Sequence, residues 1–181
     1  MPKSKSRPNR RRHVERPFIP WTTGMSATSL EGFKEEVLHC ELLIETAFPA
    51  GKATIDDVNY VRDFANLGAL ILARPNKRAW LDPDAIGENI PVIEKAVLAF
   101  KDIAMRYRHI GKVVLTGEEL NAIRFMGEAA GEVIHQSLER CPKLLFKEYL
   151  AMRHFLHGKD NQTVALNIPS FNKFVESIHY I

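Results

Sequence analysis

Apolar residues recur at alternating spacings of four and three between positions 86 and 107, and this pattern constrains the fold more than any other feature. An α-helix turns once in about 3.6 residues, so this spacing places the side chains on one helical face. No segment shows the two-residue alternation of a half-buried strand. The pattern therefore predicts a long amphipathic helix in an all-α protein, with the stripe formed by Ile86, Ile90, Ile93, Val97, Phe100, Ala104 and Tyr107.

The ends of this helix can be predicted from residues that start or stop helices. We expect it to begin at Pro91 with Asn89 as its N-cap, because proline is tolerated in the first turn and disrupts a helix interior. It ends with the cations Arg106 and Arg108, which complement the helix dipole, before the stop residue Gly111.

Four further segments combine helical periodicity with start signals. The first opens at Thr28, with Glu31 completing a capping box. The second begins at Thr54 and is apolar on more than one side, which indicates a central helix. The others begin at Thr116 and Pro142. Because short connections favour antiparallel neighbours, we predict a compact antiparallel bundle of about five helices, with a short C-terminal helix.

The sequence divides into three parts. Residues 1–20 contain four prolines and few apolar residues, so we expect a disordered tail. Residues 21–158 form the helical bundle domain, and residues 159–181 are a C-terminal segment that we expect to pack on it. Charge follows this division. Residues 1–16 hold seven lysines and arginines against one glutamate, a net charge of +6, whereas the other 165 residues carry −3.

The compartment is indicated by features that are missing from the sequence. No apolar run approaches the ~20 residues of a membrane-spanning helix, and the N-terminus lacks the apolar stretch of a secretory signal. Cys40 and Cys141 lie far apart and outside any metal or redox motif. We therefore expect a protein of the bacterial cytoplasm with no membrane partner, in which each cysteine is a small apolar filler.

Two Glu-x-x-His motifs resemble half of a di-iron site in a helical bundle: Glu36 with His39, and Glu132 with His135. At about 100° per residue, however, His39 and Glu132 both fall on the outward side of their helices. Ligands of one metal centre must converge on the interior. We therefore predict no metal site.

Other catalytic patterns are also missing. The ten glycines never form a phosphate-binding loop, and no Gly-x-Ser-x-Gly elbow occurs. Paired acids lie in first helical turns, where they stabilise the helix. The prediction is a protein that is not an enzyme and that has no catalytic residue, cofactor or metal.

Gly127 and Gly131 lie four residues apart on the fourth predicted helix. Small residues at this spacing let two helices approach closely. We expect the second helix to belong to the same domain, since Gly127 falls on the core stripe. A homodimer is possible but not favoured.

Basic residues are the main candidates for partner binding. A Lys/Arg arm suits nucleic-acid backbones, because each neutralised phosphate releases counterions. Two basic loops extend this candidate surface. The tail supplies Lys3, Lys5, Arg7, Arg10, Arg11, Arg12 and Arg16, and the loops supply Arg74, Lys77, Arg78, Arg106, Arg108 and Lys112.

The stretch from Pro17 to Trp21 has a different character. Its prolines favour an extended path, and Phe18 and Trp21 are large apolar side chains that need a surface to cover them. It is either a strap on the domain or a docking peptide for another protein. The strap is the favoured interpretation.

The chain combines a basic N-terminus with an Ala79-Trp80-Leu81 element, a helix ending in Arg106 before Gly111 and Lys112, and a helix start at Glu118-Glu119-Leu120. In these features residues 52–156 resemble small all-helical proteins encoded by phages, prophages and plasmids of proteobacteria. The resemblance implies an accessory protein of a mobile element and transfers no catalytic or binding residues.

Two functions follow as hypotheses. The first is a non-enzymatic accessory protein of a phage or mobile element that binds nucleic acid or a ribonucleoprotein through the basic tail. The alternative is a protein-binding inhibitor of a host factor, of the anti-defence type, that acts through a helical face or through residues 18–21.

Overall fold

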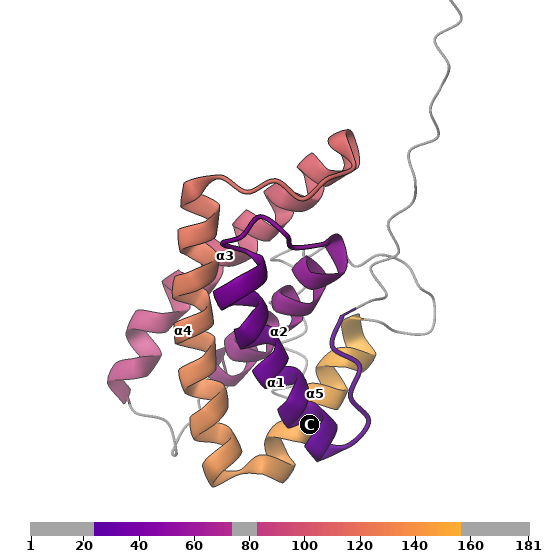
Figure 1. Cartoon of the computed structure of the whole chain (residues 1–181). Helices are drawn as coiled ribbons and strands as arrows, with labels where there is room; N and C mark the ends of the chain where they lie inside the picture. The colour runs from indigo at the N-terminus through magenta and orange to yellow at the C-terminus, as the bar shows by residue number, and fades with distance from the viewer. Residues whose placement is uncertain (1–23, 74–82, 157–181) are drawn as a thin grey trace, which may run out of the picture.

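The structure of the protein is a computed structural model, which describes residues 24–73 and 83–156. This part of the chain consists of five α-helices and one π-helical segment, without a strand (Figure 1). The predicted all-α class is therefore confirmed. The predicted tail and C-terminal helix lie outside the described residues. The elements are α1 (Leu30–Leu42), η1 (Leu43–Ala47), α2 (Ile55–Ala73), α3 (Pro83–Ile110), α4 (Gly117–Arg140) and α5 (Pro142–Leu156).

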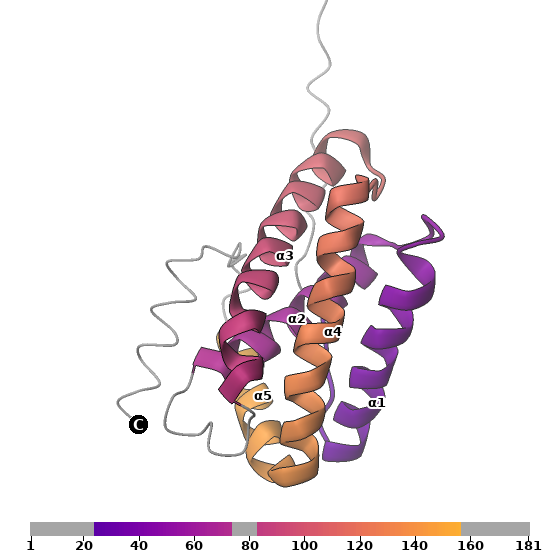
Figure 2. The same ribbon diagram turned by 90° about the vertical axis from the view of Figure 1, so that its left-hand side faces the viewer.

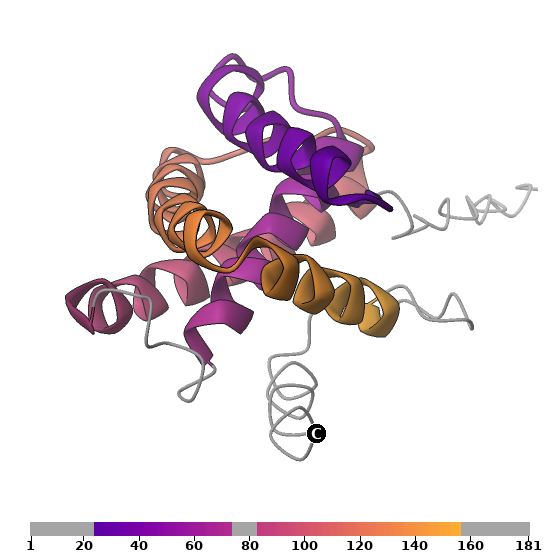
Figure 3. The same cartoon turned by 90° about the horizontal axis from the view of Figure 1, so that it is seen from below.

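The helices pack as a bundle around α2. Helices α3 and α4 form an antiparallel hairpin and share the most extensive contact, and α1 lies on the other side of α4 (Figure 2). Seen from below, α2 runs through the middle with the other helices around it (Figure 3). Its side chains are buried in an unbroken run from Val58 to Leu67 apart from Tyr60, which confirms the predicted central helix.

The first helix begins one residue later than its capping-box pattern suggests. Ser29, and not Thr28, is the N-cap of α1, and its hydroxyl accepts a hydrogen bond from the Gly32 amide at 3.1 Å. Glu31 instead pairs with Lys34. The prediction was wrong because two adjacent hydroxyl residues can both serve as N-cap, and serine is the more favourable of the two.

The start of the third helix was also predicted wrongly. Helix α3 begins at Pro83, eight residues before the expected start, and Pro91 lies inside it with an exposed side chain. Proline is well tolerated at Pro83, the first helical position. At position 91 proline removes one backbone hydrogen bond of the helix. The extensive contacts of α3 with α2 and α4 offset this local cost. The predicted end is confirmed: Gly111 has a positive φ of 69°.

Helix α1 continues into a π-helical turn, which changes the direction of its side chains. The Phe48 amide bonds to the Leu43 carbonyl five residues earlier at 3.1 Å. Leu43, Ile44 and Phe48 all lie in the core, with exposed fractions of 8%, 2% and 1%. The wide turn lies between Leu43 and Phe48 and so sets the direction of Phe48 relative to α1. Gly51, with φ 65°, then reverses the chain.

Two glycines set how closely the helices approach α4. A Cβ on Gly127 would lie 3.0 Å from Ile44 Cδ1, so this glycine lets η1 pack directly on α4. A Cβ on Gly68 would lie 2.7 Å from the Ala130 Cβ, which marks a close crossing of α2 and α4. The predicted intrachain packing at Gly127 is confirmed.

Candidate functional site

The structure describes three of the predicted binding residues: Arg106, Arg108 and Lys112. The remaining predicted residues lie outside the described part of the chain: Lys3, Lys5, Arg7, Arg10, Arg11, Arg12, Arg16, Phe18, Trp21, Arg74, Lys77 and Arg78. The three described residues lie at the end of α3 and in the turn that leads to α4. Arg108 and Lys112 are exposed, whereas Arg106 is partly covered.

Arg106 is held in an internal clamp. Its two terminal nitrogens donate to the Glu119 carboxylate at 2.9 and 2.6 Å, and one of them also donates to the Val114 carbonyl. Glu119 in turn accepts the Thr116 amide at 2.7 Å, while its own amide donates to the Thr116 hydroxyl, so Thr116 and Glu119 form a capping box and the helix start predicted at Thr116 is confirmed. Arg106 therefore joins the end of α3 to the start of α4.

The clamp shifts the pKa of both partners. The Glu119 hydrogen bond raises the pKa of Arg106. Burial acts to raise the pKa of Glu119, but the bonds from Arg106 and Thr116 outweigh it and hold this pKa below its usual value. A carboxyl with a lowered folded-state pKa stabilises the protein above its unfolded pKa of about 4.3 and loses that contribution as the pH falls through the folded value.

Arg106→Gln is expected to lower the free energy of unfolding by about 1–2 kcal/mol at pH 7, since it breaks a bidentate charge-assisted contact that is only partly exposed. The same substitution at Arg108 is the matched control. Urea unfolding followed by circular dichroism at pH 7 and pH 3.5 measures both. The deficit of Arg106→Gln should shrink as the pH falls below the unfolded carboxyl pKa of about 4.3, because the stabilisation from a lowered folded-state pKa is progressively lost there. A deficit that does not change with pH would contradict the clamp.

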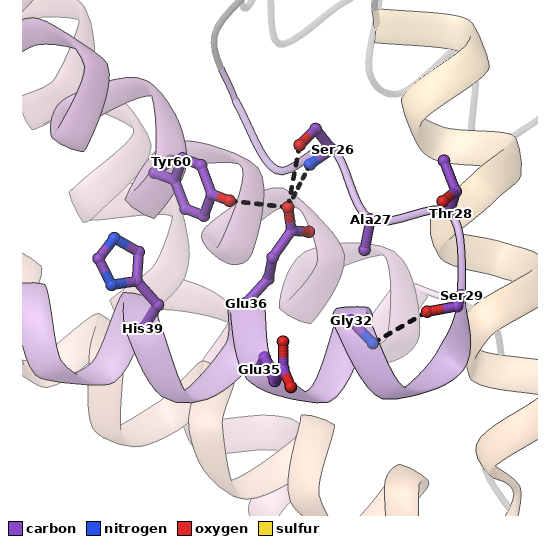
Figure 4. A pocket seen from close by; sticks show the side chains of 9 residues that line it. All are labelled: Ser26, Ala27, Thr28, Ser29, Gly32, Glu35, Glu36, His39 and Tyr60. Atoms are coloured by element: carbon purple, nitrogen blue, oxygen red, sulfur yellow. Dashed lines mark hydrogen bonds between the residues drawn. The ribbon is translucent and has the colours of Figure 1, made fainter.

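A cluster that the sequence did not indicate forms around Glu36, a half-buried residue of α1. Its Oε1 accepts the Ser26 amide at 2.6 Å and the Tyr60 hydroxyl at 2.7 Å (Figure 4). Its Oε2 accepts the Tyr149 hydroxyl at 3.1 Å. The Ser26 hydroxyl also donates to Oε1 at 3.2 Å. One carboxylate thus joins α1, α2, α5 and the segment that precedes α1.

In this cluster the serine and tyrosine groups donate hydrogen bonds and the Glu36 carboxylate accepts them. Burial, together with the Glu36 carboxylate, raises the pKa of Tyr60 and of Tyr149 above the usual tyrosine value, so both remain proton donors. Burial also raises the pKa of the Cys40 thiol, which donates weakly to the Tyr60 carbonyl at 3.7 Å. Cys40 is 0% exposed, as expected of a small core residue.

Beside Glu36 lies an open depression of about 390 Å³, lined by residues 26–29 and by one face of α1 (Figure 4). Glu35 and His39 lie at its rim, and His39 stacks edge-on against Tyr60 with ring centroids 5.4 Å apart. The Glu36 oxygens are already engaged by serine and tyrosine donors. The arrangement supports a structural role for Glu36.

The two Glu-x-x-His motifs do not converge. His39 and Glu132 are both exposed, in agreement with their expected outward positions. His135 contacts Glu41 instead, with 2.6 Å between Nε2 and Oε1. Within residues 24–73 and 83–156, no group of three or more histidine, cysteine, aspartate or glutamate side chains is arranged to hold a metal.

The described residues, 24–73 and 83–156, carry the opposite charge to the tail. They contain 13 lysines and arginines against 18 aspartates and glutamates, a net charge of −5 with histidine neutral. Two further arginines have internal contacts. Arg62 is buried against Asp63 at 3.1 Å, and Arg153 donates to the Ser26 carbonyl at 2.7 Å. With Arg106, this makes three basic residues with structural roles.

No family model, curated protein or solved structure matches the chain. No helix in the described ranges, 24–73 and 83–156, is both long and apolar enough to cross a membrane.

Proposed function

We propose that this protein is a non-enzymatic accessory protein of a phage or mobile element, which binds nucleic acid, free or within a ribonucleoprotein, through its basic N-terminal arm, residues 1–16. The observation that carries the proposal is the separation of charge. The arm carries a net charge of +6, whereas the described residues, 24–73 and 83–156, carry −5.

This separation of charge favours the arm as the part of the protein that attracts nucleic acid. An acidic helical body repels a phosphate backbone, and Arg62, Arg106 and Arg153 are engaged within the fold. The arm has seven cations within 14 positions, and binding through them releases counterions from the nucleic acid. Recognition by such an arm is driven by the backbone and depends on salt rather than on base sequence.

Deletion of residues 1–16 is expected to abolish salt-sensitive binding to duplex DNA or RNA. For the full-length protein, the logarithm of the binding constant should fall with the logarithm of salt concentration with a slope of about −5 to −6, if six or seven phosphates are neutralised. Fluorescence anisotropy over a salt series measures this slope. The control is Lys112→Gln, which removes one exposed cation of the helical domain. This substitution should change the slope by less than about 1. Equal affinity with and without the arm contradicts the proposal.

A further inference from the structure

Residues 24–27, which precede α1, are bound to the bundle by side chains of two different helices. The Ser26 amide donates to Glu36 Oε1 of α1 at 2.6 Å. The Ser26 carbonyl accepts from Arg153 Nη1 of α5 at 2.7 Å, so the segment runs beside α5 (Figure 1). Met25 is 1% exposed and belongs to the core. This irregular segment is therefore part of the folded domain, and its backbone is bonded to both α1 and α5.

Helix α5 is held by the same carboxylate as the segment. Its Tyr149 hydroxyl donates to Glu36 Oε2 at 3.1 Å, whereas the Ser26 amide donates to Oε1. The Tyr149 ring also packs against Phe33 of α1, with ring centroids 4.7 Å apart. Arg153, one turn further along α5, binds Ser26 from the other side and completes a closed ring of contacts. Because of this ring, a movement of α5 away from α1 also breaks a bond of the segment.

A single residue connects α5 to α4. Helix α4 ends at Arg140 and α5 begins at Pro142, while Cys141 between them has non-helical backbone angles, φ −143° and ψ 51°. Hinges in proteins are a few residues of this kind at the ends of elements. Helix α5 packs on α1 and α4, whereas the most extensive helix contacts lie among α2, α3 and α4. A rotation at Cys141 therefore moves α5 while those three helices stay packed.

We infer that residues 24–27 and α5 form a lid on α1, which opens as one unit about Cys141 while α2, α3 and α4 remain folded. The inference goes beyond the proposed function and does not depend on nucleic-acid binding. Opening exposes Phe33, which is 0% exposed under the closed lid, and frees the Oε2 atom of Glu36. The open state thus presents an aromatic ring and a carboxylate on α1.

Opening also removes the support that keeps α5 helical. Isolated helices shorter than about 12–15 residues are marginally stable in water, and α5 has 15 residues. Its backbone hydrogen bonds should therefore break when it leaves α1. Hydrogen exchange of the α5 amides reports this event, and exchange of the Ser26 amide reports release of the segment from Glu36.

Residue-resolved hydrogen exchange of the full-length protein at low urea concentrations tests the lid without any substitution. The Ser26 amide and the amides of residues 146–153 should share one opening free energy. The amides of residues 61–71 in α2 should exchange more slowly, because they open only when the whole fold unfolds. A Ser26 amide that opens independently of α5 overturns the inference, and so does an α5 that exchanges no faster than α2.

Arg153→Gln removes the direct contact between α5 and the segment. It should speed exchange of the Ser26 amide and of residues 146–153 by the same factor, about tenfold, because hydrogen bonds from a charged donor are lost in the closed state. Faster exchange in only one of the two parts of the lid overturns the inference. If this variant does not fold, the measurement on the unsubstituted protein still decides the question.

The matched control is Arg106→Gln, the same substitution in the clamp between α3 and α4. The clamp stays intact when the lid opens, so this variant should leave exchange of the lid amides unchanged. Exchange in α2 should become faster, because global unfolding breaks the clamp. Lid amides that accelerate by the same factor as α2 would show that the lid opens only on global unfolding, and would overturn the inference.

Discussion

Gly68→Ala is expected to lower the free energy of unfolding by about 1–2 kcal/mol, although alanine favours helix more than glycine does. The added Cβ would lie 2.7 Å from the Ala130 Cβ and 3.1 Å from the Ala130 Cα. The backbone of α4 cannot yield as a flexible side chain would, so α2 and α4 must separate. Both helices supply many core side chains, so a separation of α2 and α4 would weaken the apolar contacts along the whole interface between them.

Two variants make this result specific. Gly117→Ala adds a Cβ that meets nothing within 4 Å, so its stability should be unchanged or slightly raised. Ala130→Gly removes one partner in the predicted clash and should partly rescue Gly68→Ala. Urea unfolding of the single and double variants gives the coupling energy. Strictly additive effects would show that the two positions do not meet.

Glu36→Ala is expected to cost about 3 kcal/mol of unfolding free energy, because hydrogen bonds to a charged acceptor contribute about 1.5–3 kcal/mol each and are not fully additive. The substitution removes the acceptor of the Tyr60 and Tyr149 hydroxyls and of the Ser26 amide. Tyr149 is 0% exposed, so its hydroxyl cannot recover a bond to water without movement of α5.

The neighbouring residue provides the control. Glu35 has the same charge and lies in the same helix, but it is exposed, so Glu35→Ala should change stability by less than about 0.5 kcal/mol. Thermal and urea unfolding compare the two variants. Tyr149→Phe should cost less in the Glu36→Ala background than in the parent, since the bond is already lost. A similar loss of unfolding free energy in the Glu35→Ala and Glu36→Ala variants would contradict this role of the cluster, because it would show that removing a negative charge from α1 is enough to destabilise the protein.

Local signals were enough to predict most helix positions. The Thr116–Glu119 capping box, the start at Pro142 and the stop at Gly111 all depend on residues within one or two turns. Predictions failed where two local choices were nearly equal in energy. Thr28 and Ser29 are comparable N-caps, and proline at either Pro83 or Pro91 can open a helix.

The candidate site was less accessible to sequence reasoning. Arg106 looks like a free cation in a basic run, yet it is bound to Glu119, 13 residues away. Glu36 looks like part of a metal motif, yet it accepts hydrogen bonds from Tyr60 and from Tyr149, 113 residues away. One signal was present: Glu36 borders the apolar stripe of α1, and buried tyrosines need an acceptor.

The sequence by itself determined that the chain is helical, that α2 is central, and that positive charge gathers in residues 1–16. These properties depend on periodicity and composition, which are read along the chain. Only the tertiary structure decided which polar side chains are structural. A carboxylate, guanidinium or amide has the same identity in any setting, and its role depends on the partner that folding brings within about 3 Å. That partner is set by how α1, α2, α4 and α5 pack.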